Sequence, residues 1–140
     1  MRKILIASHG RVASGVKSAV GILLGDSSMV EAVDCYLDKE DFSPRIEKFI
    51  QSVKPEDEAV IFTDLVGGSV CNKVMTLRPE EHGVIHVSGF NLIAVLGCCL
   101  SDEPLTEAVV DEILSTASVQ MKRVVVEPDI PTADDDDFFS

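Results

Sequence analysis

A histidine and an aspartate occupy equivalent positions in two segments of this chain. His9 lies between an apolar stretch, residues 3–7, and a helix-like stretch, residues 11–24, while Asp64 follows a second apolar stretch, residues 58–63. A histidine at the carboxyl end of a strand, beside the unpaired N–H groups of a helix start, can attack and hold an anionic group. A lone histidine there is more commonly an ordinary turn residue, and the matching aspartate is what favours phosphoryl chemistry.

The aspartate would have a defined task beside such a histidine. A carboxylate that accepts a hydrogen bond from one imidazole nitrogen fixes the tautomer and leaves the other nitrogen free to attack. Because a phosphoryl group brings about two negative charges, it must bind on the side of His9 away from Asp64. Candidate donors to its oxygens lie in two turns, at Gly10, Gly67, Gly68 and Ser69. Taken alone, Asp64 is equally well explained as a helix N-cap, and the glycines as a tight turn.

The elements that position these residues follow from the hydrophobic pattern. Apolar runs alternate with helix-period stretches, which is typical of an α/β protein with a mostly parallel sheet flanked by helices. Strands are predicted at residues 2–7, 29–37, 58–63 and 83–88, with a further β-rich run at 121–127. Helices are predicted at residues 10–24, 69–77, 91–100 and 104–119, and one that opens at 41–44 and runs to 53. Gly25 is expected to cap the first helix.

Strand order decides whether the histidine and the aspartate meet. In an open parallel sheet, ligands bind beyond the carboxyl ends of the strands, where the strand order reverses. If the order is 2-1-3-4, an assumption at this point, the reversal falls between strands one and three. His9 and Asp64 would then face the same crevice.

Length, charge and hydropathy limit the class of protein. The 140 residues form one domain, and no apolar run reaches the ~18 residues of a membrane span. The basic start leads into a short strand rather than a signal peptide, so we expect a cytoplasmic protein. The net charge of −12 argues against nucleic-acid binding and suits basic protein partners.

The remaining metal-binding residue types form no recognisable site. The four cysteines make neither a C-x-x-C pair nor a zinc spacing with the later histidines, and we interpret them as free core thiols: Cys35, Cys71, Cys98 and Cys99. His82 is expected to be solvated and His86 to be packed in a strand. We therefore predict no metal and no cofactor.

Three stretches together resemble the IIA component (EIIA) of the mannose/fructose/sorbose family of the bacterial phosphoenolpyruvate-dependent sugar phosphotransferase system (PTS). They are residues 6–10 with Ala13 and Gly15, residues 63–69 with Asn72, and residues 88–92. The resemblance implies an EIIA domain over residues 1–128. Residues 129–140, which include a run of four aspartates, are expected to be a disordered acidic tail.

The resemblance also implies a function and a site. His9 would accept a phosphoryl group from the phosphohistidine of the carrier protein HPr and pass it to a histidine of the sugar-specific IIB component. Asp64 would orient His9, and the glycine-serine turn would line the phosphoryl site. The membrane components IIC and IID would be met only indirectly, so sugar specificity resides in the later components. Three further residues are expected to line the same groove: Ser8, Asn72 and Asn91.

The fold implied by the resemblance is a sheet of order 2-1-3-4 with a C-terminal antiparallel strand exchanged between the subunits of a homodimer. Residues 121–127 would be that strand, and the alternative is that they pair with the edge of their own sheet. The chain departs from the common family pattern at Val66, Val70 and Ile93-Ala94. These departures affect the shape of the groove and the choice of partner rather than the His9–Asp64 pair.

Other functions share parts of this pattern. A subunit that feeds phosphoryl groups to a dihydroxyacetone kinase has the same fold and corner histidine, although Gly10 and the complete Gly67-Gly68-Ser69 turn fit the sugar-transport members better. A regulatory module controlled by phosphorylation of His9 is a second alternative. A metabolic enzyme with a small substrate is disfavoured, since the sequence has no G-x-G-x-x-G run and no Walker lysine motif.

Overall fold

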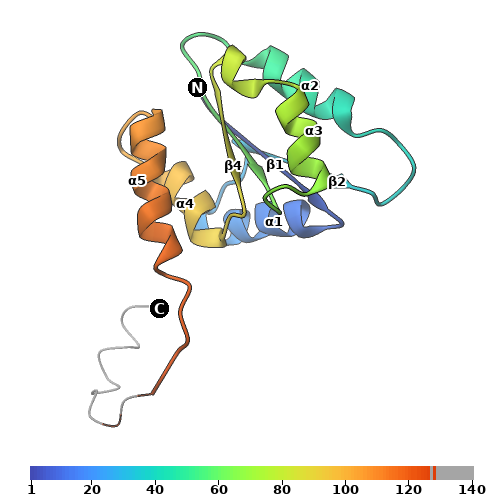
Figure 1. Ribbon diagram of the computed structural model, residues 1–140. Helices are drawn as coiled ribbons and strands as arrows, with labels where there is room; N and C mark the ends of the chain where they lie inside the picture. Colours follow the sequence, from blue (N-terminus) through green and yellow to red (C-terminus); the bar gives the residue numbers. More distant parts are fainter. Residues whose placement is uncertain (127, 129–140) are drawn as a thin grey trace.

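The protein, seen in a computed structural model that describes residues 1–126 and residue 128, is built on a four-stranded parallel sheet. Its strands are β1 (Arg2–His9), β2 (Val30–Cys35), β3 (Glu58–Thr63) and β4 (Val84–Ser88). Their order is β2-β1-β3-β4, which confirms the predicted α/β class and the 2-1-3-4 order. The two central strands, β1 and β3, run side by side and end at the same edge (Figure 1).

Helices follow every strand. They are α1 (Val12–Leu24), α2 (Ser43–Ser52), α3 (Ser69–Thr76), α4 (Leu92–Leu100) and α5 (Glu107–Ser118), with a short 3-10 helix η1 (Pro79–His82) that was not predicted. Gly25 is the C-cap of α1, as expected. Helix α5 begins later than predicted because the Thr106 hydroxyl accepts the N–H of Val109 and caps the first turn there.

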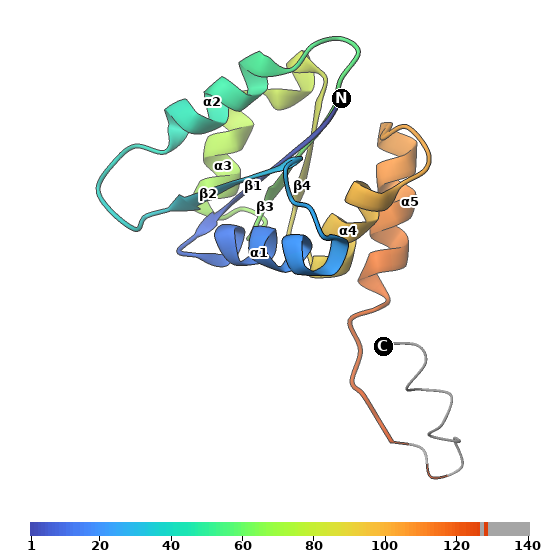
Figure 2. The same ribbon diagram turned by 180° about the vertical axis from the view of Figure 1, so that it is seen from behind.

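The sheet is covered on both faces, which is why its central strands are continuously apolar. Side chains of β1 alternate between the two faces. Ile4 and Ile6 pack with residues of α1, α4 and α5, whereas Leu5 and Ala7 pack with residues of α2 and α3. Figures 1 and 2 show these two helical layers on opposite sides of the sheet. The candidate site lies at the strand ends of this sheet, which is packed against helices on both faces.

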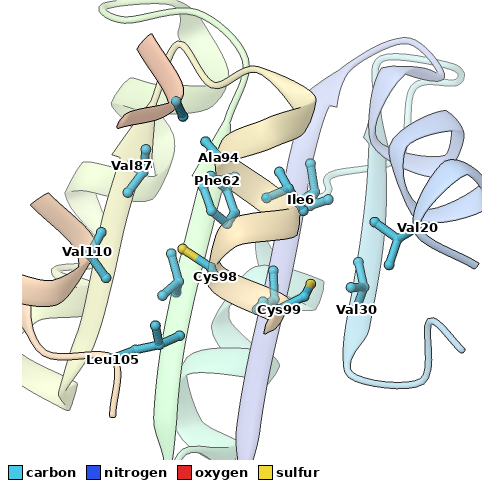
Figure 3. Packing of buried hydrophobic residues seen from close by; sticks show 14 of the residues in the cluster. Ile6, Val20, Val30, Phe62, Val87, Ala94, Cys98, Cys99, Leu105 and Val110 are labelled. Carbon is cyan, nitrogen blue, oxygen red and sulfur yellow. The ribbon is translucent and has the colours of Figure 1, made fainter. Parts of the chain in front are cut away.

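The four cysteines belong to this core. All four are free and buried, as predicted. Cys98 and Cys99 lie in α4 and pack with Phe62 and Ile6 of the sheet (Figure 3). Burial raises the pKa of the Cys98 thiol to about 11, so this side chain stays protonated and packs as a small apolar group at neutral pH.

The segment after α5 lies outside the sheet. Residues 121–126 form no strand in this chain, and Figure 1 shows them running away from the domain. Pairing with the sheet edge of the same chain is therefore not observed over these residues. The predicted acidic tail, residues 129–140, lies outside the described residues. In the described part of the chain, no helix has the length and apolar character to cross a membrane.

Helices α4 and α5 approach each other so closely at one point that only glycine fits. A Cβ atom added at Gly97 would lie 2.7 Å from Cγ2 of Ile113, a methyl group on a branched, partly buried side chain. In contrast, a Cβ at Gly15 in α1 would meet nothing within 4 Å. Alanine substitutions at these two glycines therefore distinguish the cost of overpacking, expected at Gly97, from the intrinsic effect of alanine in a helix, expected at Gly15.

We expect Gly97→Ala to lower the free energy of unfolding by about 1–3 kcal/mol, because α4 and α5 must separate to admit the methyl group. The control, Gly15→Ala, should raise it by about 0.4–1 kcal/mol, since alanine restricts the unfolded chain. Urea titrations followed by circular dichroism measure both. A Gly97→Ala variant as stable as the parent would contradict the close packing of α4 on α5.

Candidate functional site

The predicted histidine and aspartate meet at the carboxyl ends of the central strands. His9 is the last residue of β1, and Asp64 directly follows β3. Oδ2 of Asp64 lies 2.9 Å from Nδ1 of His9 and also accepts the backbone N–H of His9 at 2.9 Å. Because an ionised carboxylate only accepts hydrogen bonds, Nδ1 carries the proton and the lone pair is on Nε2.

The parallel pairing of β1 with β3 places these residues together. Ala7 is opposite Thr63 in the register, so the residues that follow each of them, His9 on β1 and Asp64 after β3, are close neighbours. Asp64 is not a helix N-cap, because α3 begins at Ser69 with Gly68 in the cap position. That alternative explanation of Asp64 is wrong, and its carboxylate instead joins two strand ends.

Two opposing effects set the ionisation of the Asp64 carboxyl. Burial raises its pKa, but the hydrogen bonds from the His9 backbone and ring together hold the pKa below its ordinary value. Its second oxygen, Oδ1, accepts the N–H of Leu65 at 3.0 Å. The Asp64 side chain is 14% exposed and that of His9 is 41% exposed, so the carboxylate is shielded while the ring faces solvent.

The open nitrogen of His9 faces the Ser69 hydroxyl, which is hydrogen-bonded to a second hydroxyl, that of Tyr36. Nε2 lies 3.2 Å from Oγ of Ser69, and the Tyr36 hydroxyl donates to the same Oγ at 2.9 Å. The ring of Tyr36 stacks on the imidazole, with ring centroids 5.3 Å apart. The predicted contact of Ser69 with the site is thus made by its side chain.

Sequence reasoning missed Tyr36. It extended the second strand to Leu37, whereas β2 ends at Cys35 and the chain turns sharply at Tyr36. The signal that would have found it is an aromatic residue with a polar tip at the carboxyl end of the strand that neighbours β1. In the observed register Cys35 is paired with His9, so the next residue of β2 reaches the site.

The glycine-serine turn is shaped by its backbone. Gly67 has a φ of +74°, a left-handed conformation that suits glycine, and Asn72 donates from Nδ2 to the Gly67 carbonyl at 3.1 Å. A Cβ at Gly68 would lie 3.2 Å from the Leu65 carbonyl oxygen, so a side chain there would crowd the turn.

Two of the predicted phosphoryl donors are already engaged. The Gly10 N–H donates to the Cys35 carbonyl at 2.9 Å, and the Gly68 N–H donates to the Leu65 carbonyl at 3.0 Å. The first residue of α3, Ser69, has an N–H that a helix start leaves without an intrahelical acceptor. Of Gly10, Gly68 and Ser69, it is therefore Ser69 whose backbone N–H can still donate to a ligand.

Two of the three predicted groove residues have other roles. Ser8 is fully buried, and its hydroxyl accepts the Ala13 N–H at 2.7 Å, so it stabilises the start of α1 instead of lining a groove. Asn91 accepts the Ala94 N–H at 2.9 Å and donates to the Ala117 carbonyl at 2.8 Å. It caps α4, ties it to α5 and lines a separate cavity of about 170 Å³.

An open hollow adjoins the hydroxyl side of His9. It has a volume of about 820 Å³ and runs between the loop after β2 and helix α3. Ser69 and the third predicted groove residue, Asn72, line it together with Tyr36. Across residues 1–126, no three His, Cys, Asp or Glu side chains come together in an arrangement that could hold a metal ion.

The other strand histidine is part of a separate polar cluster. Nε2 of His86 lies 2.8 Å from Oγ1 of Thr63, which also donates to the Ser88 hydroxyl at 2.8 Å. Burial lowers the pKa of His86. The expected packing of His86 in the sheet is confirmed.

Comparison with known proteins places the chain in a family. A family model described as the PTS system fructose IIA component, EIIA-man, matches residues 3–114. The chain belongs to this EIIA family. The match includes both His9 and Asp64 and ends within α5.

Solved structures of PTS proteins have the same fold. A Streptococcus pneumoniae PTS IIA protein associated with a fucose utilization operon is 25% identical, with a TM-score of 0.75 over 87% of this chain and 92% of that chain. A Klebsiella pneumoniae protein described as a candidate sugar PTS permease is 27% identical, with a TM-score of 0.77 over 87% and 90%. A mannose/sorbose-specific IIA subunit from Enterococcus faecalis is 18% identical, with a TM-score of 0.70 over 93% and 98%, which supports the fold alone.

Because the folded-state pKa of Asp64 is depressed, its ionisation stabilises the fold above the unfolded-state pKa, and this contribution is lost as the pH falls through the folded-state value. We expect Asp64→Asn to lower the free energy of unfolding by about 1–2 kcal/mol at pH 7. The gap between parent and variant should narrow below about pH 4. Urea titrations at pH 7, 5, 4 and 3 measure it, with the exposed Asp111→Asn as control. A gap that is the same at every pH would contradict the depressed pKa.

Proposed function

We propose that this EIIA protein is a phosphocarrier of a sugar PTS. In this proposal, Nε2 of His9 accepts a phosphoryl group from phosphorylated HPr and passes it to a histidine of a IIB component. The observation that carries the proposal is that the two ring nitrogens of His9 have different surroundings. Nδ1 is held by the Asp64 carboxylate at 2.9 Å, whereas Nε2 faces the Ser69 hydroxyl and the open side of the site.

The chemistry balances without a cofactor. The lone pair of Nε2 forms the new N–P bond as the N–P bond of the donor phosphohistidine breaks and its electron pair returns to the donor nitrogen. The proton on Nδ1 stays between His9 and Asp64, so the imidazolium charge that develops on His9 lies against a carboxylate at 2.9 Å. Transfer to the IIB component is the same step in reverse, with a new acceptor nitrogen.

The surface around His9 suits a protein donor. Exposed apolar side chains follow the carboxyl ends of three neighbouring strands: Val12 after β1, Leu37 after β2, and Leu65 and Val66 after β3. Such a group of apolar residues around a polar centre is typical of a protein–protein contact. The net charge of −12 additionally favours encounters with basic partner faces.

In this proposal, the protein forms a homodimer whose subunits exchange their C-terminal strands. Strand β4 is at the edge of the sheet and pairs only with β3 among the described strands. An unpaired edge is a template for a further strand. Val124 and Val126, which have strand-forming side chains, are exposed in the segment that leaves α5. In this proposal the segment pairs with the sheet edge of the partner subunit.

The phosphocarrier proposal predicts that His9→Ala abolishes phosphoryl acceptance without unfolding the protein, because the nucleophile is lost and the ring is partly exposed. Incubation with labelled phosphoenolpyruvate, the general PTS enzyme and HPr should label the parent at residue 9 with acid-labile, base-stable phosphate. The matched control, His82→Ala on the surface, should label normally. Label retained in folded His9→Ala would place the acceptor elsewhere. Chasing the label into IIB, or into a dihydroxyacetone kinase, separates transport from the alternative role.

If strand exchange holds the dimer together, the protein should be dimeric only when residues 121–127 are present. At micromolar concentration, light scattering should give the mass of a dimer for the full chain and for a chain ending at Pro128. A chain ending at Gln120 should have the mass of a monomer, because the pairing segment is gone. A monomeric full chain, or a dimeric chain ending at Gln120, would contradict strand exchange.

A further inference from the structure

Tyr36 has an unfavourable backbone conformation beside the proposed nucleophile. Its φ is +67°, in the left-handed region that residues with a Cβ rarely adopt. Aromatic side chains gain nothing locally from this conformation, in contrast to the short polar side chains of Asn and Asp. Such backbone strain persists only where the surrounding structure imposes it, and it concentrates at functional sites.

The strained turn places the Tyr36 ring over His9. The ring stacks on the imidazole at a centroid distance of 5.3 Å and an interplanar angle of 29°. Its other neighbour is Phe42, which meets it edge-on at 5.3 Å. Tyr36 is therefore held between the imidazole and the residue before α2, with 55% of its surface exposed.

The hydroxyl of Tyr36 sets the direction of the hydrogen bond between Ser69 and His9. It donates to Oγ of Ser69 at 2.9 Å, and that Oγ lies 3.2 Å from Nε2 of His9. Because Oγ accepts the hydrogen bond from Tyr36, the hydroxyl hydrogen of Ser69 is free to point to Nε2. Asp64 accepts from the opposite nitrogen at 2.9 Å. Tyr36 and Asp64 thus favour the same tautomer from opposite ends of the ring.

We propose that Tyr36 is a positioning residue for phosphoryl transfer, acting on His9 through the Ser69 hydroxyl and by stacking on the imidazole. This inference rests on the proposed phosphocarrier function. Tyr36 neither gains nor loses a proton in the transfer. When Nε2 forms a bond to phosphorus, the Ser69 hydroxyl loses its nitrogen acceptor and turns to a phosphoryl oxygen. Tyr36 keeps Ser69 oriented throughout.

A double-mutant cycle tests the route through Ser69. Single-turnover transfer from phosphorylated HPr is measured for the parent, Tyr36→Phe, Ser69→Ala and the double variant. We expect Tyr36→Phe to slow transfer about threefold to tenfold, the effect of one neutral hydrogen bond. In the Ser69→Ala background, Tyr36→Phe should cause no further loss. An unchanged rate for Tyr36→Phe, or losses that multiply in the double variant, would overturn the proposal.

The dependence on HPr concentration separates positioning from docking. Tyr36→Phe should lower the maximal rate and leave the half-saturating HPr concentration unchanged, because the exposed ring remains. Leu37→Ala, the matched change at the adjacent exposed apolar residue, should raise the half-saturating concentration instead. A rise in that concentration with Tyr36→Phe, at an unchanged maximal rate, would make Tyr36 a docking residue and reject the proposal.

A measurement without HPr distinguishes failure of this inference from failure of the phosphocarrier function. In ¹⁵N-labelled parent protein, the His9 ring nitrogens should report a proton on Nδ1 and a hydrogen bond accepted by Nε2. Tyr36→Phe should move the Nε2 resonance toward that of a nitrogen that accepts none. Unchanged resonances would overturn the role of Tyr36 even if the parent protein is phosphorylated. Absence of label in the parent protein would reject the phosphocarrier function itself.

Discussion

The carboxylate of Asp64 is the group on which the geometry of this site depends. One of its oxygens accepts both the backbone N–H and the ring N–H of His9, and the other accepts the N–H of Leu65. A single side chain therefore fixes the end of β1, the orientation of the imidazole and the first residue of the turn after β3. Because ionisation strengthens all three contacts, the charge that orients the ring also holds the strand ends together.

The fold could be predicted from the sequence wherever the hydrophobic pattern ends at the residue where the backbone leaves the strand or helix. The bounds of β3 follow from an apolar run enclosed by a charged residue and a turn, and the 2-1-3-4 order that the family resemblance implied is the order observed. The second strand was overextended because Tyr36 is a residue type that strands favour and Leu37 continues the apolar run. Its end at Cys35 comes from the left-handed conformation of Tyr36, which no glycine marks in the sequence.

The sequence predicted the pairing of His9 with Asp64 correctly, but it did not predict the roles of the surrounding polar residues. Topology alone brings the ends of two adjacent parallel strands together, so His9 and Asp64 could be paired from the sequence. Short polar side chains bind either a ligand or the nearest backbone, and the sequence pattern is the same in both cases. Ser8 and Asn91 bind backbone at the starts of α1 and α4, because those N–H groups lie within reach of their side chains.

The charges around His9 suit a group that is held briefly. In the proposed relay, the phosphoryl group is attached on the side opposite Asp64, in a chain of net charge −12. In that relay, the Ser69 hydroxyl and the first N–H groups of α3 would favour the anion locally, while the overall charge would disfavour it. A carrier that bound its cargo much more tightly than its donor or acceptor would stall transfer. In the proposed relay, opposition between local donors and overall charge would keep the phosphorylated and free states closer in free energy, which transfer between two proteins requires.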